Sequence, residues 1–306
     1  MLRRLLLYLS AAKWARGIVM RWGVARTVAR RFIAGETIDE ALTVSRQLND
    51  QGLLVSLDYL GESVASAADT EDVVSTYRRL LASIHERGLQ AGVSLKLTHL
   101  GLDIGEELCL LNLRAILTDA KAHAIPVTID MESSAYTEKT LQIFRTMHQD
   151  YDFDNLGTVI QAYLFRTADD MRALATEGAT IRLCKGAYLE PPTVAFPEKA
   201  DVDKNYVEVM RAYLAAPPPA YLQLATHDEN IIQTAEGLIR AGNLQNRSEF
   251  QMLYGIRSAR QLELAQAGFP VRVYVPFGEA WYPYFMRRLA ERPANLWFFA
   301  KSFFRS

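Results

Sequence analysis

Two adjacent arginines near the end of the chain, Arg287 and Arg288, have the clearest capacity for binding chemistry. The pattern around them predicts a helix over residues 279–291. On that helix Tyr284, Arg288 and Glu291 share one face, and Arg287 lies beside them. Two guanidinium groups placed together can bind a carboxylate or a phosphate in a bidentate manner. Local sequence alone favours a simpler interpretation, a solvated face on which Glu291 pairs with Arg287.

The elements that must position these arginines follow a repeating pattern. Eight apolar, β-branched runs predict strands, at 53–58, 91–96, 126–130, 157–161, 180–185, 221–226, 249–253 and 271–274. Helical patterns follow them near 71–88, 105–124, 137–149, 167–177, 203–216, 228–242, 258–267 and 279–291. Alternation of this kind indicates parallel strands with crossover helices, and eight repeats favour an α/β fold closed into a (β/α)8 TIM barrel. A doubly wound open sheet is the competing fold, but neither GxGxxG nor GxxxxGK[ST] occurs.

In a barrel, the carboxyl ends of the strands meet at one mouth. The residues expected there are Asp58, Lys96, Asp130, Glu132, Gln161, Arg182, Lys185, Thr226, His227, Gln251, Leu253 and Tyr274. Burial of so many charges without partners is costly, so the set predicts an anionic ligand among the basic residues. A flat lining such as Gln161 and Tyr274 would suit a planar cofactor.

The residues alone leave the reaction open. A Schiff-base lyase could use Lys96 or Lys185, because a desolvated lysine can lose its charge and become a nucleophile. A barrel that binds a small anion without catalysis is another interpretation. A metal-dependent hydrolase is disfavoured, because no His-x-His pair follows the first strand, and we expect no metal.

The amino-acid composition narrows the class of protein but does not identify it. The chain has 306 residues, 50% of them hydrophobic and 23% charged, with a net charge of −1, which gives no general attraction to nucleic acid. The two cysteines, Cys109 and Cys184, have neither disulfide nor metal spacing, so a reducing compartment fits best. The sequence has no apolar run long enough for an ordinary membrane span.

The first 35 residues carry eight basic side chains and no acidic one, with apolar residues in helical spacing. They predict either a membrane-surface helix or helices packed on the main domain, while a secretory signal is disfavoured because basic residues interrupt the apolar stretch. We therefore expect N-terminal amphipathic helices over residues 1–45 and a catalytic barrel over residues 46–306.

Several stretches, in order, resemble the proline dehydrogenase family of flavoenzymes, which have a distorted (β/α)8 barrel. They are RFIAGE at 31–36, VSLKLT at 93–98, VTID at 127–130, VIQAY at 159–163, TIRLCKGAY at 180–188, LATHD at 224–228, FQMLYG at 250–255, YVPFG at 274–278 and RRLAE at 287–291. The resemblance spans residues 30–291. It implies that L-proline is oxidised to Δ1-pyrroline-5-carboxylate, with FAD taking the hydride and a membrane quinone reoxidising it. It also implies a cytoplasmic enzyme that is peripheral on the inner membrane, with possible transfer of the product to a pyrroline-5-carboxylate dehydrogenase.

The resemblance also implies roles for individual residues. The substrate carboxylate would be held by Lys96, Arg287 and Arg288, and the proline ring would pack against Leu253 and Tyr274. Positions that match FAD contacts are Met131, Gln161, Arg182, Cys184, Lys185, Gly186, Ala187, Lys199, Thr226, His227 and Glu291. Asp130 and Arg182 match positions associated with activity, and Arg182 would lie near flavin N5. Because hydroxyproline-oxidising relatives lack a tyrosine at position 274, Tyr274 implies a preference for proline. No strand-end residue is an obvious base for the amine proton.

Overall fold

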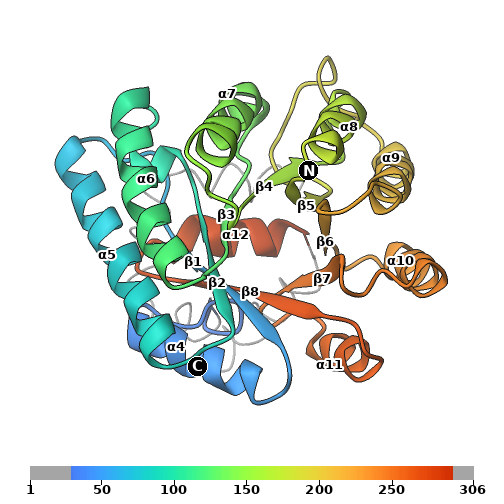
Figure 1. The fold of residues 1–306 in the computed structure, drawn as a ribbon, viewed down its shortest axis with the longest axis horizontal. Helices are drawn as coiled ribbons and strands as arrows, with labels where there is room; N and C mark the ends of the chain where they lie inside the picture. The colour runs from blue at the N-terminus through green and yellow to red at the C-terminus, as the bar shows by residue number, and fades with distance from the viewer. Residues whose placement is uncertain (1–28, 292–306) are drawn as a thin grey trace, which may run out of the picture.

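Eight parallel strands close into a barrel, as the alternating pattern predicts (Figure 1). The structure is a computed structural model and describes residues 29–291. The strands are β1 (Leu54–Tyr59), β2 (Ala91–Leu95), β3 (Val127–Ile129), β4 (Leu156–Gln161), β5 (Thr180–Cys184), β6 (Tyr221–Ala225), β7 (Ser248–Leu253) and β8 (Val271–Phe277). Because β1 pairs with both β2 and β8, the sheet has no open edge.

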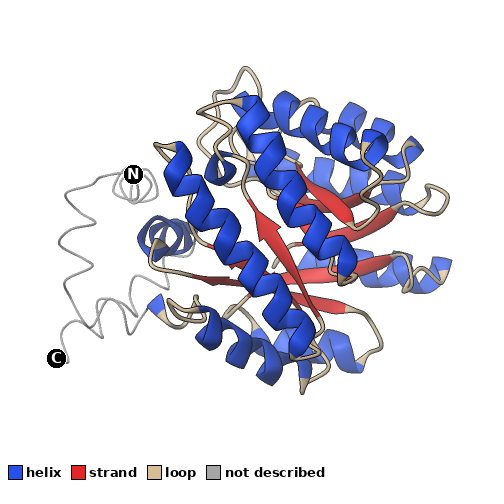
Figure 2. Ribbon diagram, turned by 60° about the vertical axis from the view of Figure 1, so that its left-hand side comes forward, coloured by secondary structure: helices blue, strands red, loops and turns tan. Residues whose placement is uncertain are grey.

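Helices surround the barrel as an outer layer (Figure 2). They are α4 (Ile38–Asn49), α5 (Ala67–Glu86), α6 (Glu106–Ala122), α7 (Ser134–Arg145), α8 (Thr167–Thr176), α9 (Lys199–Leu214), α10 (Glu229–Gly242), α11 (Ser258–Gln266) and α12 (Trp281–Glu291). A 3-10 turn, η1 (Thr98–Leu100), follows β2, and a π-helical turn, η2 (Thr146–Asp150), extends α7. Each of the eight strands and eight following helices expected for the barrel is present, so the barrel prediction is confirmed.

Several element boundaries differ from the expectation by a few residues, among them the start of α5, which lies at Ala67 rather than near residue 71. The helix α9 begins at Lys199 rather than near residue 203, and β8 continues to Phe277 instead of ending at residue 274. The expected division between residues 45 and 46 falls inside α4, which packs on β1 and β8. The helices expected before residue 29 lie outside the described residues.

Capping boxes fix where the first two outer helices begin. The Thr37 side chain accepts a hydrogen bond from the backbone N–H of Glu40, whose carboxylate in turn accepts from the backbone of Thr37. Ser66 and Asp69 form the same reciprocal pair at the start of α5. Each cap contributes about 1 kcal/mol by satisfying backbone donors that a helix leaves free.

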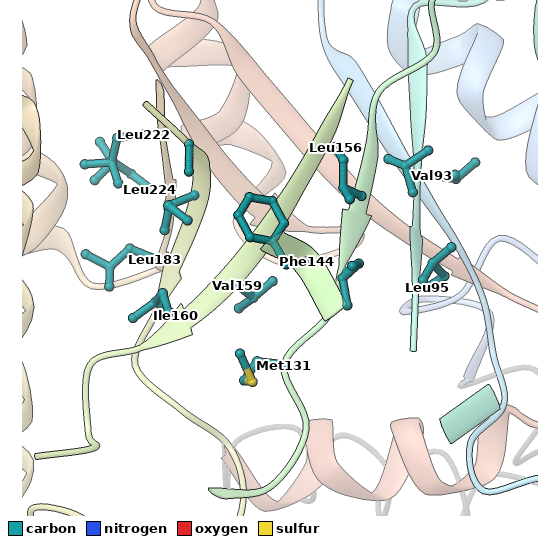
Figure 3. Close-up of a cluster of buried hydrophobic side chains, with 14 of the residues drawn as sticks. Val93, Leu95, Met131, Phe144, Leu156, Val159, Ile160, Leu183, Leu222 and Leu224 are labelled. Carbon is teal, nitrogen blue, oxygen red and sulfur yellow. The ribbon is translucent and has the colours of Figure 1, made fainter. Parts of the chain in front are cut away.

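The main hydrophobic core lies in the barrel and between its strands and the helices. Figure 3 draws part of it, with Phe144 of α7 among strand residues such as Leu156, Val159 and Leu183. All four are at most 5% exposed. Burial on both faces explains why the strands read as nearly continuous apolar runs in the sequence.

A second, smaller core covers the carboxyl end of the barrel. It joins residues 29–33 to α12, whose Trp281 and Phe285 are fully buried one turn apart. Leu253 and Tyr274 pack against this cluster from the barrel side. In Figure 1, α12 crosses the ring of strands, so this helix lies over the barrel. The structure therefore brings the helix that carries the two late arginines to the mouth.

Backbone contacts fix the N-terminal segment to the same end. The backbone N–H of Ala34 donates to the carbonyl of Pro276 at 2.9 Å, and that of Gly278 donates to Gly35 at 3.0 Å. Among residues 29–291, no helix is long and apolar enough to cross a membrane.

Candidate active site

The centre of the mouth is a bridge between two aspartates from neighbouring parts of the barrel. The Tyr274 hydroxyl oxygen lies 2.7 Å from Oδ2 of Asp58 and 2.7 Å from Oδ2 of Asp130. Asp58 stands on β1 and is 1% exposed, while Asp130 directly follows β3. Tyr274 comes from β8, which reaches β1 only because the barrel is closed. Burial and the two nearby carboxylates raise the pKa of Tyr274 well above its ordinary value.

Arg182 enters this bridge from β5. Its NH1 donates to Oδ1 of Asp130 at 2.6 Å, and its NH2 donates to the Ser94 hydroxyl at 2.8 Å. The guanidinium carbon also lies 5.3 Å from the centre of the Tyr274 ring. Burial raises the pKa of Asp130, and the positive charge of Arg182 opposes part of that rise. The structure thus brings together the two residues that the resemblance associated with activity.

Lys96 lies on the other side of the bridge. Its Nζ is 3.5 Å from Oδ2 of Asp58, and the residue is 8% exposed. The Arg288 guanidinium lies 5.1 Å from the ring centre of Tyr284 on α12. The side chains of Arg287 and Glu291 are outside the described part of the chain, so the expected pairing between them, and their expected contacts, stay predictions.

Lys185 and Lys199 belong to a separate charged cluster at the edge of the mouth. Lys185 donates to Asp228 at 2.8 Å and also to Asp203, while Lys199 donates to the same two carboxylates. The sequence predicts a helix from about residue 203, which leaves Lys199 before the helix. It is instead the first residue of α9, and Asp203 follows it at the i+4 position. The sequence did not predict the ion pairs that join both lysines to Asp203 of α9 and to Asp228 at the start of α10.

Carboxylate partners thus face each basic strand-end residue whose side chain is described. Lys96 meets Asp58, Arg182 meets Asp130, and Lys185 meets Asp228. The sequence interpretation stressed the positive charges, whereas the mouth is a set of ion pairs. A Schiff-base lysine needs an uncharged amine, so pairing of Lys96 and Lys185 with carboxylates counts against that alternative.

Other predicted cofactor positions line the ends of β3 to β6. Gln161, at the end of β4, donates from Nε2 to the Glu132 carbonyl at 3.2 Å, and its buried Oε1 accepts no hydrogen bond among the described residues. Gly186 has φ +110°, and an added Cβ would lie 2.3 Å from a ring carbon of Tyr163. Only glycine fits there without rearrangement. Met131 is buried after β3, and Ala187 follows Gly186 in the loop.

Hydrogen bonds with the protein hold the two residues that follow β6, Thr226 and His227, in place. The Thr226 hydroxyl accepts from the backbone N–H of Asp228 at 3.1 Å. The ring Nε2 of His227 accepts from the backbone N–H of Leu253 at 3.0 Å, which requires a neutral ring with its proton on Nδ1. His227 therefore ties β6 to β7 in addition to any contact with a ligand.

Two groups near the mouth have shifted pKa values. Desolvation raises the pKa of the half-buried Cys184 thiol to about 12, which disfavours the reactive thiolate. Burial also raises the pKa of Glu132, although hydrogen bonds from Thr98 oppose the rise. Among residues 29–291, no cluster of three or more metal-binding side chains is present.

Sequence reasoning missed four residues that hold the site together: Ser56, Ser94, Asp203 and Asp228. Strand alternation offered a signal for the serines, because each stands two positions before a residue expected at the mouth and so faces the same side. The two serine hydroxyls lie 2.9 Å apart beneath Arg182. Asp228 caps the start of α10, where an acidic residue is ordinary, and Asp203 lies within α9 at the i+4 position from Lys199.

The fold and this mouth define a (β/α)8-barrel enzyme site built from buried ion pairs at the strand ends. A family model described as proline dehydrogenase matches residues 41–301. The chain is 45% identical over 302 residues to proline dehydrogenase 1 of Bacillus subtilis (strain 168), covering 98% of each protein. It is 41% identical over 272 residues to a proline dehydrogenase of Deinococcus radiodurans, covering 88% of this chain and 87% of that one.

A solved structure agrees with these matches. It is proline utilization A from Bdellovibrio bacteriovorus inactivated by N-propargylglycine, with a TM-score of 0.81 and 25% identity, and the match covers 87% of this chain and 33% of that one. The chain therefore belongs to the proline dehydrogenase family, and it is an enzyme of the oxidoreductase class.

Proposed function

We propose that the protein oxidises L-proline to Δ1-pyrroline-5-carboxylate, with FAD as hydride acceptor and a membrane quinone as the final electron acceptor. The observation that carries this proposal is the Tyr274, Asp58, Asp130 and Arg182 network at the mouth. It joins Asp58 to Tyr274, Asp130 and Arg182, for which the resemblance implies roles in substrate binding, cofactor binding or activity, and it lies beside Leu253 and beneath α12. Membership of the family supports proline as the substrate.

The residues present fit a flavin. The buried Oε1 of Gln161 accepts no hydrogen bond from the described residues, and the buried Nε of Arg182 donates none to them. A buried amide oxygen and a buried guanidinium N–H without partners are costly, and a flavin ring has both N–H donors and acceptor atoms on its edge. At Gly186 the backbone packs directly against the buried Tyr163 ring, which fixes the course of the loop beside the proposed flavin site.

In this proposal each protein group has a defined task. Lys96, together with Arg287 and Arg288, binds the substrate carboxylate, which fixes the orientation of the proline ring. Leu253 and Tyr274 form the walls against which that ring packs. When bound, FAD supplies a two-electron acceptor for the hydride from C5 of proline. Arg182 is held by Asp130 and the two serines, so its positive charge is fixed where negative charge develops.

Purified protein provides the test. We expect a yellow protein whose visible flavin absorption bleaches when L-proline is added without oxygen, and recovers when a soluble quinone is added. D-proline serves as a matched control, because the carboxylate clamp cannot hold the opposite enantiomer with C5 in the same place. Colourless protein, or flavin absorption that L-proline leaves unchanged, would contradict the proposal.

A further inference from the structure

The Tyr274 hydroxyl makes two short contacts, one to Asp58 and one to Asp130, but it has only one proton to donate. The Tyr274 oxygen is 2.7 Å from one carboxylate oxygen of Asp58 and 2.7 Å from one of Asp130, both typical distances for O–H···O hydrogen bonds. A phenol carries a single proton, so it can donate only one of these bonds. An ionised carboxylate is an acceptor only, so the other contact would set two acceptor oxygens against each other at 2.7 Å.

We propose that Asp58 and Asp130 share one proton across the Tyr274 hydroxyl, and that Asp58 is a positioning residue that holds Tyr274 in place only while this proton is present. With the extra proton, one carboxyl donates to the phenol oxygen and the phenol donates to the other carboxylate. Every oxygen in the bridge then has a hydrogen bond, and the two aspartates carry one negative charge instead of two.

The surroundings of Asp58 agree with a proton on the pair. Its Oδ1 is buried and accepts no hydrogen bond from the described residues. A buried oxygen that accepts no hydrogen bond costs less free energy when it is the carbonyl oxygen of a neutral carboxyl group than when it belongs to an ionised carboxylate. Lys96 is 3.5 Å from the other oxygen, a distance longer than a strong charge-assisted bond.

Two opposing effects act on the protonation state of Asp130. Its 2.6 Å bond from Arg182 favours the ionised form, whereas burial raises its pKa and favours the protonated form. Like charges that share a site cannot both ionise easily, so the proton belongs to the pair and not to one carboxyl group alone. The described titratable or charged groups that face the pair are Lys96 of the β2 end, Arg182 and Cys184 of β5, Tyr77 of α5 and His99 of η1.

Infrared spectroscopy of the flavin-loaded, full-length protein tests the shared proton directly. At neutral pH we expect a C=O stretching band of a protonated carboxyl group that shifts in D2O and disappears as the pH is raised. Both Asp58→Asn and Asp130→Asn should remove it, because a single carboxylate can accept from Tyr274 without an extra proton. The matched control is Glu132→Gln, which removes a different buried carboxyl group and should leave the band in place. Absence of the band in the wild-type protein, or its persistence in Asp58→Asn, would overturn the proposal.

The role of Asp58 in positioning Tyr274 rests on the proposed function, and the pH dependence of KM for L-proline tests it separately. In the wild type, KM for L-proline should rise by on the order of tenfold over the pH range in which the band disappears, the loss expected for one hydrogen bond to a charged group. In Asp58→Asn the amide can donate to the phenol oxygen at any pH, so KM should stay constant over that range. An equal rise in both proteins would show that Asp58 does not position Tyr274. The infrared band needs no turnover, so failure of proline oxidation would leave the proton test intact.

Discussion

At the scale of single residues, Tyr274 has two separable parts. Its ring packs against the cluster under α12 and lies near the Arg182 guanidinium, while its hydroxyl joins two aspartates. The sequence interpretation could place Tyr274 at the mouth because it ends a strand-like run. It could not predict the bridge, because no local signal specifies the register that sets Tyr274 opposite Ser56 between the last and first strands.

Substitutions at Tyr274 should separate these two parts. In Tyr274→Ser the pocket loses its aromatic wall, so the ratio of kcat/KM for proline to that for hydroxyproline should fall by on the order of tenfold, as expected for lost pocket contacts. Tyr274→Phe keeps the ring and loses the hydroxyl, so it should lower kcat/KM for proline and keep most of the discrimination. Steady-state kinetics on both substrates measure this. An unchanged ratio in the serine variant would count against Tyr274 as the specificity residue.

At the scale of elements, the loop between β5 and α9 is held by its backbone conformation and by the ion pairs beyond it. Gly186 takes a positive φ two residues after the end of β5, and Lys185 between them is anchored to Asp203 on α9 and to Asp228 at the start of α10. The loop can therefore present backbone to a ligand without becoming loose.

Two glycine-to-alanine changes should have opposite effects. Gly186→Ala forces a Cβ into the Tyr163 ring at a strained φ, so it should destabilise the fold by about 1–3 kcal/mol and weaken flavin retention. Gly237→Ala, on an exposed face of α10 with open space around the added Cβ, should stabilise by about 0.5–1 kcal/mol. Urea unfolding followed by circular dichroism measures both. Equal effects at the two positions would contradict the role given to Gly186.

The start of α10 should make stability depend on acid pH. Burial alone would raise the pKa of Asp228, but hydrogen bonds and charges from Lys185 and Lys199 outweigh it and lower that pKa to about 2, well below the ordinary range of an aspartate. A lowered pKa in the folded state means stability that is present above pH 4 and lost as the pH falls towards 2.

The variant Asp228→Asn isolates this contribution. It keeps an acceptor for the helix cap and removes the charge, so at pH 7 it should cost about 1–2 kcal/mol after screening of the partly exposed pair. The difference from the wild type should shrink between pH 4 and pH 2. Chemical unfolding over this range measures it, and a constant difference at all pH values would show that charge is not the cause.

At the scale of the whole molecule, strand count and barrel closure followed from the sequence because the hydrophobic runs are local signals that repeat. The acidic partners of the basic residues at the mouth could not be predicted from the sequence. Asp228 caps α10 and Asp203 lies in the second turn of α9, and the sequence cannot tell a helix cap or an i,i+4 helix pair from a partner for Lys185. The family resemblance named positions such as Gln161 and Gly186, but their unpaired oxygen and their strained backbone appear only in three dimensions.

The uneven charge along the chain makes a prediction about membranes. The chain has a net charge of −1, yet its first 35 residues carry eight basic side chains and no acidic one. We propose that this segment holds the enzyme at an anionic membrane surface, where each basic residue contributes about 1 kcal/mol at low ionic strength. Sedimentation with anionic vesicles should therefore weaken as salt is added, because the attraction is screened within a Debye length.

Deletion of residues 1–20 removes half of these basic side chains, so it should reduce sedimentation with anionic vesicles and leave the already weak binding to uncharged phosphatidylcholine vesicles unchanged. Proline-dependent bleaching of the flavin serves as the check that the shortened protein is folded. Reduction of a quinone dissolved in the vesicles should fall together with binding, because the electron acceptor is then out of reach. Equal binding after deletion would move the membrane contact to the barrel itself.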